Sequence, residues 1–218
     1  MNATKTDEVD ALIEPALADR ALNKNLILLV VGIGQLMIVL DLTIVNVALE
    51  NIRATLRVDN ASDLQWIVTG YAVVFGGFLL LGGKLADRFG RRRIFVTGAV
   101  IFAVASLIGG LAGSLGMLIA ARALQGFGAS LMSPAALAIL AVVFSPGPER
   151  DRAFGVWAAI SAGGAALGLL LGGFLTEYAD WRWVFFVNVP IAIGAIFAAY
   201  RIIPETRDEH ARDFDVVG

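Results

Sequence analysis

The sequence predicts an all-α polytopic membrane protein with six transmembrane helices, and three observations lead to this prediction. Of the 218 residues, 58% are apolar and only 17% are charged. A soluble domain is typically about 45–50% apolar and about 25% charged. The mean hydropathy is +0.77, and long uncharged runs rich in glycine recur along the chain. These features are typical of helices that cross a membrane, and they argue against a soluble globular protein and exclude a disordered one.

The composition also excludes several classes of function. The net charge of -2 argues against a nucleic-acid-binding protein, which would carry a basic excess. The chain has no cysteine, so it forms no disulfide and no thiolate metal site, and its single histidine, His210, lies in a polar tail. The sequence contains neither a phosphate-binding Walker loop nor the strained turn of a serine hydrolase. We therefore expect no enzyme activity, no metal and no cofactor.

Six runs with few or no charges are long enough to cross a membrane. A spanning helix needs about 20 apolar residues at a rise of about 1.5 Å each. The run over residues 94–148 carries one charge, Arg122, and would form a helix of about 80 Å, so we expect two helices joined by the glycine-rich stretch 109–116. Pro190 interrupts the last run, which neighbouring helices can accommodate. The expected spans are residues 26–49, 64–83, 94–112, 117–144, 153–176 and 183–203.

Polar segments flank these spans at both ends of the chain. Residues 1–24 form a polar tail that lacks the features of a signal peptide, residues 25–203 hold the bundle, and residues 204–218 are a second polar segment. Thirteen of the 17 Lys and Arg residues fall on the side of both tails, three fall on the other side, and Arg122 lies in a span. Because basic loops stay in the cytoplasm, this distribution predicts a multi-pass protein of the plasma (inner) membrane with both termini cytoplasmic.

The loop over residues 83–93 carries an unusual arrangement of charges. A short basic loop would satisfy the charge rule, but it would not explain why Asp87 lies among five cations. Nor would it explain why Gly83 and Gly90 frame the turn. Glycine allows a tight turn, and Asp87 can pair with an arginine or with the positive N-terminus of a helix.

With the first two residues after this loop, residues 83–95 read G-x-L-A-D-R-x-G-R-R-x-x-F, which resembles the signature loop of the major facilitator superfamily between its second and third helices. The resemblance implies that the loop is a conformational latch on the cytoplasmic side and that Asp87 is its key acidic residue. The residues assigned to the latch are Gly83, Asp87, Arg88, Gly90 and Arg91.

Three further segments narrow the resemblance to the fourteen-helix drug/proton antiporter branch. Residues 40–49 are similar to its first-helix motif, with Glu50 where proline is usual. Residues 122–129 resemble its fourth-helix motif, and residues 181–190 resemble the entry to its sixth helix. Residues 214–218 resemble the start of a seventh helix, so the resemblance implies the N-terminal six-helix bundle of a longer transporter whose C-terminal half is missing. It also implies two three-helix repeats of inverted topology within this bundle.

Asp41 and Arg122 are the candidates for proton coupling. A charged side chain at a span centre costs about 2.5–3.5 kcal/mol or more, so Asp41 must face protein or water. It is either a structural carboxylate or a group that exchanges a proton, since burial disfavours the charged form of a carboxylate. Arg122 either extends to the membrane interface or places its charge inside the bundle near Asp41. The family's arginine at this motif position is linked to proton coupling.

Polar residues near these two charges are candidates to line a cavity. In the first span, Gln35, Thr43 and Asn46 share one helical face, and we expect them to form a broad polar side together with Asp41. In the fourth span, Gln125 follows Arg122 by one turn and extends its polar face.

The fifth span carries a stripe of small residues, Gly164, Gly168 and Gly172, at four-residue spacing. Such spacing allows close helix packing. The segment also resembles the antiporter motif of drug exporters, although Leu169 replaces the usual proline and removes the expected kink.

Together these features predict a transporter for the proton-driven efflux of drugs or other hydrophobic small molecules. Its expected partners are a small-molecule substrate, protons, the lipid bilayer and the missing C-terminal half, with no nucleic acid. Two alternatives remain at this point, a facilitator that carries a metabolite and a six-span membrane protein that transports nothing.

Overall fold

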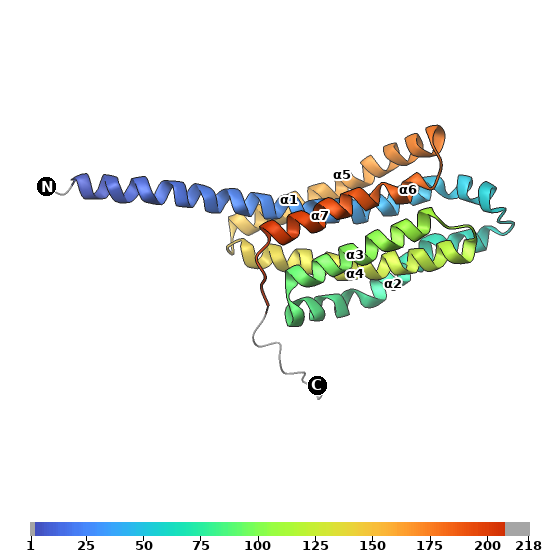
Figure 1. The fold of residues 1–218 in the computed structure, drawn as a ribbon, viewed down its shortest axis with the longest axis horizontal. Helices are drawn as coiled ribbons and strands as arrows, with labels where there is room; N and C mark the ends of the chain where they lie inside the picture. Colours follow the sequence, from blue (N-terminus) through green and yellow to red (C-terminus); the bar gives the residue numbers. More distant parts are fainter. Residues whose placement is uncertain (1–2, 208–218) are drawn as a thin grey trace, which may run out of the picture.

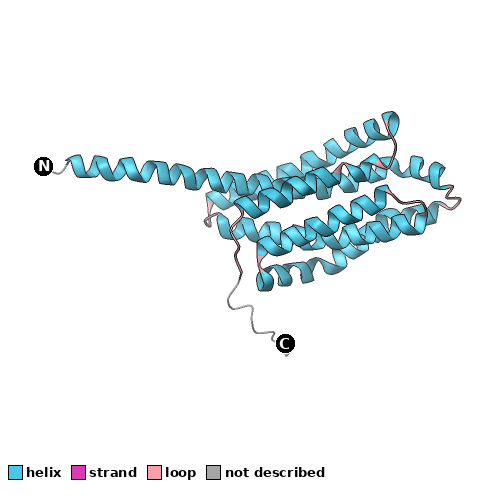
Figure 2. Ribbon diagram, in the orientation of Figure 1, coloured by secondary structure: helices cyan, strands magenta, loops and turns pink. Residues whose placement is uncertain are grey.

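The structure, a computed structural model, describes residues 3–207, with side chains from residue 24 onward. This part of the chain is helical throughout and contains no strand (Figures 1 and 2). The helices are α1 (Ala3–Leu56), α2 (Ala61–Phe89), α3 (Arg91–Gly110), α4 (Leu115–Val143), α5 (Pro148–Tyr178), α6 (Trp183–Phe186) and α7 (Asn188–Ile202).

Within the described residues, six segments are long and apolar enough to cross a membrane, which confirms the predicted fold class. The sixth segment, Trp183–Ile202, consists of α6 and α7 with a break at Val187. The second and fifth helices extend beyond the expected spans, because charged residues at their ends continue the helix outside the hydrocarbon region. The helix α1 likewise continues back through most of the expected polar tail.

Two of the turns are tighter than the sequence indicates. Gly90 alone separates α2 from α3, and its φ of 110° is a conformation that glycine adopts without strain. The expected glycine-rich turn at 109–116 is shorter than predicted, because Gly109 and Gly110 still belong to α3. Ser114 then caps α4, since its Oγ accepts a hydrogen bond from the Met117 amide at 3.3 Å.

The helices pack as two groups that meet along the middle of the bundle (Figure 1). In one group α5 pairs with α1, and in the other α2 and α3 both pack on α4. The helix α7 lies against both α1 and α3 and so joins the two groups. Both the start of the α1 span and the end of α7 lie at the end of the bundle that also holds the α2–α3 and α4–α5 turns. We call this the basic end, because Lys24, Lys84, Arg88, Arg91, Arg92, Arg93, Arg150, Arg152 and Arg201 lie there.

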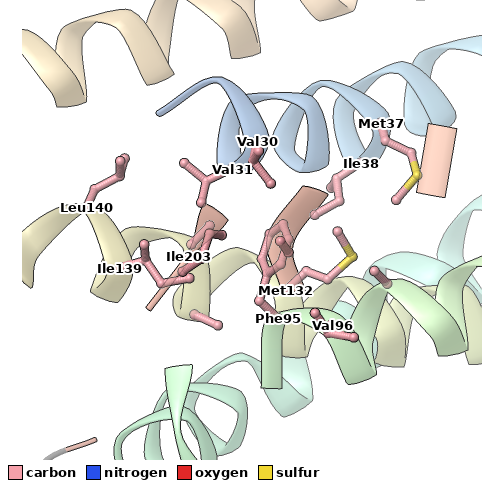
Figure 3. Close-up of a cluster of buried hydrophobic side chains, with 14 of the residues drawn as sticks. Val30, Val31, Met37, Ile38, Phe95, Val96, Met132, Ile139, Leu140 and Ile203 are labelled. Carbon is pink, nitrogen blue, oxygen red and sulfur yellow. The ribbon is translucent and has the colours of Figure 1, made fainter. Parts of the chain in front are cut away.

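Two clusters of buried apolar side chains fill the interior. The first cluster lies toward the basic end and takes α1 residues between 27 and 38, together with side chains of α3 and α4 such as Phe95 and Met132 (Figure 3). The second lies toward the other end and takes α1 residues between 40 and 52, together with Trp181 and Phe185. Asp41 therefore lies where the two clusters meet.

Glycines bring α4 into close contact with both of its neighbours. Gly98 of α3 and Gly128 of α4 face each other, so that a Cβ on Gly98 would lie 2.6 Å from the Gly128 carbonyl oxygen. A Cβ on Gly82 of α2 would overlap the Ser130 carbonyl oxygen of α4. Small residues allow such backbone approach, which van der Waals packing between membrane helices requires.

The glycine stripe of α5 lies at its contact with α1. Gly164, Gly168 and Gly172 are all buried, and a Cβ on Gly168 would overlap the Thr43 hydroxyl oxygen. A Cβ on Gly172 would lie 3.0 Å from Val47 Cβ. The stripe therefore lies where close packing requires it.

Candidate functional site

The only two fully buried ionisable groups of opposite charge among the described side chains are Asp41 of α1 and Arg122 of α4, each 0% exposed. Arg122 Nη1 donates a hydrogen bond to Asp41 Oδ2. Arg122 therefore does not extend to the membrane interface, and Asp41 faces protein. The two proton-coupling candidates, 81 residues apart in the chain, form one ion pair.

Three neutral side chains complete a polar cluster around this pair. Gln125 Nε2 donates to Asp41 Oδ1 at 2.9 Å and to Ser106 Oγ at 2.8 Å, while its Oε1 accepts from Arg122 Nη1 at 2.9 Å. Asn188 Nδ2 donates to Asp41 Oδ1 at 2.9 Å. The polar cluster of Asp41, Ser106, Arg122, Gln125 and Asn188 thus connects α1, α3, α4 and α7. The sequence analysis did not single out Ser106 and Asn188. The one feature that could have indicated them is that each is a polar residue within an apolar run.

Arg122 also binds α2 independently of Asp41. Its Nε donates to the Ile67 carbonyl oxygen at 3.1 Å. Its guanidinium carbon lies 4.3 Å from the centre of the Tyr71 ring, a cation–π contact inside the bundle. Arg122 therefore keeps partners on α2 and α4 even if its bond to α1 is lost.

Several polar atoms at the edge of the polar cluster have no hydrogen-bond partner among the described residues. They are Arg122 Nη2, Asn188 Oδ1 and the Tyr71 hydroxyl oxygen, all buried. Buried groups of this kind are usually paired, so each unpaired one reduces the net stabilisation that the cluster provides. The polar cluster therefore retains unused donors and acceptors next to its central ion pair.

The other polar residues of the first span lie apart from Asp41. Gln35 Nε2 donates to Ser161 Oγ of α5 at 3.1 Å, Thr43 bonds only to carbonyl oxygens of its own helix, and the exposed Asn46 donates to the Leu42 carbonyl oxygen. At about 100° per residue, Thr43 and Asn46 lie about 160° and 140° from Asp41 around the helix. These residues therefore do not join Asp41, whereas Gln125 does.

The residues assigned to the latch lie around the turn at Gly90. Arg91 donates to Asp87 Oδ1 through Nη2 at 2.9 Å and through Nε at 3.2 Å, which joins the end of α2 to the start of α3. The Arg88 guanidinium lies 5.6 Å from the centre of the Phe89 ring. A Cβ on Gly83 would make only ordinary contact with Pro134, at 3.8 Å.

Glu205, which sequence reasoning also missed, binds this turn to the segment after α7. Its Oε1 accepts from the Arg92 amide at 3.2 Å, and its Oε2 lies 3.6 Å from Nε of both Arg92 and Arg93. Alongside it, the Arg91 amide donates to the Thr206 carbonyl oxygen at 2.9 Å. A Cβ on Gly90 would overlap Glu205 Oε1. The turn therefore needs glycine for its conformation and also for this contact.

Replacing Glu205 with glutamine is expected to loosen this contact with little loss of stability. The substitution removes two partly exposed ion pairs, and pairs of this kind contribute about 0.2–1 kcal/mol. Hydrogen exchange of the Arg91 and Arg92 amides should become faster, while exchange in the middle of α4 should not change. The control is Glu177→Gln, which removes an exposed acid at the far end of the bundle. Unchanged exchange at both amides would contradict a role for Glu205 in holding the turn.

Six membrane-spanning helices around a buried acid–base cluster define a multi-pass membrane protein. The chain belongs to the Major Facilitator Superfamily, whose sequence profile matches residues 31–216. This is a family of transporters rather than enzymes, as the sequence predicted. The expected start of a seventh helix at residues 214–218 lies outside the described residues.

Relatives of known sequence include several drug-resistance and export proteins. The chain is 51% identical over 180 residues to the puromycin resistance protein pur8 of Streptomyces alboniger, covering 83% of this chain and 35% of that protein. It is 46% identical over 174 residues to the cephamycin export protein CmcT of Amycolatopsis lactamdurans, covering 80% of this chain and 36% of that protein. The chain thus spans little more than a third of the length of these relatives, and it is related to drug-resistance transporters as predicted.

Solved structures share the fold. A proton:xylose symporter, XylE, superposes with a TM-score of 0.76 at 19% sequence identity, covering 88% of this chain and 49% of that chain. A bacterial homologue of the lysosomal transporter Spinster gives a TM-score of 0.67 at 20% identity, covering 83% of this chain and 42% of that chain. At these identities the likeness establishes the fold alone, namely one six-helix half of the transporter architecture.

Proposed function

We propose that this chain forms the N-terminal half of a proton-coupled exporter of drugs or other hydrophobic small molecules. In this proposal the protein lies in the plasma (inner) membrane with both termini in the cytoplasm, and a second six- to eight-helix part completes the substrate path. Transport by alternating access needs both halves around a site near the membrane midplane. The named relatives support the class of substrate, since they confer resistance to puromycin or export cephamycin.

The ion pair between Asp41 and Arg122 is the observation that carries the proton-coupling part of the proposal. A proton bound to Asp41 would neutralise the carboxylate and remove its attraction for Arg122. Arg122 would keep the Gln125 side chain, the Ile67 carbonyl and the Tyr71 ring. Protonation would therefore weaken the bond between α1 and α4 and leave the bonds between α4 and α2 in place. A ligand that binds more tightly to one protonation state of Asp41 would therefore also favour one packing of α1 against α4. Such a difference in affinity between two states is what shifts their populations.

Drug efflux by cells that carry the whole transporter tests this proposal. Asp41→Asn should lower proton-driven efflux by at least about tenfold, because the asparagine cannot exchange a proton, while the variant still binds drug. Glu50→Gln is the matched control, since it removes an exposed acid from the same helix. Full coupling in Asp41→Asn would rule out the proton-site role of Asp41.

The reading frame in the native DNA tests the assignment of this chain to one half of a transporter. If six to eight further spans follow Gly218, efflux is measured on the whole product. A stop codon directly after Gly218 would contradict the proposed half, and self-association of the chain in membranes would then be measured.

A further inference from the structure

A cavity of about 660 Å³ opens at the basic end, between the start of the α1 span, the end of α4 and the end of α7. Three cations line it, Lys24, Arg92 and Arg201, and no aspartate or glutamate does. Its remaining lining is mainly apolar. These apolar residues are Ile27, Val142, Val143, Ile202 and Ile203.

The cations around this cavity outnumber the carboxylates that neutralise them. Lys24 Nζ forms an ion pair with Glu149 Oε1 at 2.7 Å. Glu205 is shared between Arg92 and Arg93 at 3.6 Å each. The Arg201 guanidinium carbon lies 5.0 Å from the centre of the Phe197 ring. No carboxylate of the described residues lies within ion-pair distance of Arg201. Three lining cations therefore have two carboxylate partners, Glu149 and Glu205, and Glu205 is also shared with Arg93 outside the cavity, which leaves the charge of Arg201 without a carboxylate among the described residues.

The position of the cavity favours a ligand that has both a charged headgroup and an apolar chain. The last turns of α7 expose large aromatic side chains beside it, with Phe197 62% exposed and Tyr200 56% exposed. Since α7 is a membrane-spanning segment, its end lies at the membrane interface, where a headgroup and an acyl chain meet. A small soluble anion would satisfy the cations but leave the apolar wall in water. Basic cavities between membrane helices bind anionic headgroups.

We propose that this cavity binds an anionic phospholipid, with its phosphate near Arg201 and Lys24 and an acyl chain along the exposed face of α7. The lipid would then bridge α1, α4 and α7, three of the four helices that the polar cluster joins. Arg92 lines the same cavity and also bonds Glu205, so a bound headgroup would contact the turn at Gly90 indirectly. The proposal does not depend on the substrate or on proton coupling.

Native mass spectrometry of the purified 218-residue chain tests this proposal with three probes. They are phosphatidylglycerol, phosphatidylcholine with the same acyl chains, and inorganic phosphate. We expect phosphatidylglycerol to bind more tightly than phosphatidylcholine and inorganic phosphate not to displace it at equal concentration. Arg201→Gln and Lys24→Gln should each weaken phosphatidylglycerol binding about fivefold. Arg201→Lys, which keeps the charge, should bind within about twofold of the native chain.

The matched control is Lys84→Gln, which removes an exposed cation at the basic end that does not line the cavity. It changes the net charge equally and should leave lipid binding unchanged. An equal loss of binding in Lys84→Gln would overturn the proposal in favour of unspecific attraction to the basic end. Complete displacement of the lipid by inorganic phosphate would overturn it in favour of a soluble anion.

Discussion

Replacing Arg122 with methionine is expected to lower the free energy of unfolding by about 3–5 kcal/mol, the usual cost of leaving a buried charge without its partner. In this variant Asp41 would still accept hydrogen bonds from Gln125 and Asn188, but no cation would neutralise it. The loss can be measured for the 218-residue chain by titrating detergent micelles with a denaturing detergent. Arg150→Met is the control, because it removes an arginine outside the polar cluster.

The double variant Asp41→Leu/Arg122→Met shows whether Arg122→Met is destabilised because Asp41 lacks its partner or because the bundle is misfolded. Replacing a buried ion pair as a whole by apolar side chains is often close to neutral. We therefore expect the double variant to be more stable than Arg122→Met alone, with a coupling free energy of about 1–3 kcal/mol. If the losses of unfolding free energy in the two single variants add up to the loss in the double variant, the two side chains do not act as a pair.

Replacing Gly82 with alanine is the second change for which we expect a large effect. The added Cβ would overlap the Ser130 carbonyl oxygen, and a backbone atom cannot turn aside as a side chain can. The helix α2 would have to move away from α4, and overpacking of this kind costs about 1–3 kcal/mol or more. The shift would also disturb Ile67 and Tyr71, which bind Arg122. A lower yield of folded protein and a lower thermal midpoint in detergent are the measured results.

The control for this change lies five residues earlier in the same helix. A Cβ on Gly77 would meet no atom within 4 Å, so Gly77→Ala changes only the helical propensity. Alanine is favoured over glycine in a helix interior by up to about 1 kcal/mol, so this variant should be as stable as the native chain or slightly more stable. Equal stability of the Gly82 and Gly77 variants would mean that α2 and α4 are less closely packed than described.

The sequence predicted the number of spans well and the ends of the helices poorly, for one physical reason. Hydropathy reports which residues tolerate hydrocarbon, and helices continue past that region into the polar interface, as α2 does up to Phe89. The turn at 109–116 shows the same limit. Glycine favours turns in general, but in α3 Gly109 and Gly110 serve as contact surfaces for Phe185 and Phe186.

The candidate site was predictable where a charge interrupted an apolar run. Asp41 and Arg122 stand out because burying either one alone is costly, and the structure brings them together. Asn188 and Ser106 are neutral, so burying them is less costly and their signal is weaker. Gly82 was overlooked in favour of its neighbour Gly83, because only the distance between two helices shows which glycine needs to be small.

The position of Asp41 between two apolar clusters has an electrical consequence. Counted along the α1 span, Lys24–Leu56, Asp41 lies about 25 Å from one end and about 22 Å from the other at about 1.5 Å per residue. Both flanking clusters are apolar, so they act as insulating layers across which a membrane potential falls. An elementary charge crossing the whole membrane changes its energy by about 2.3 kcal/mol per 100 mV, and a proton that reaches Asp41 from either side crosses about half of that. If Asp41 exchanges a proton as proposed above, binding of that proton would therefore depend on voltage, and a variant that moves the carboxylate along α1 would change that voltage dependence.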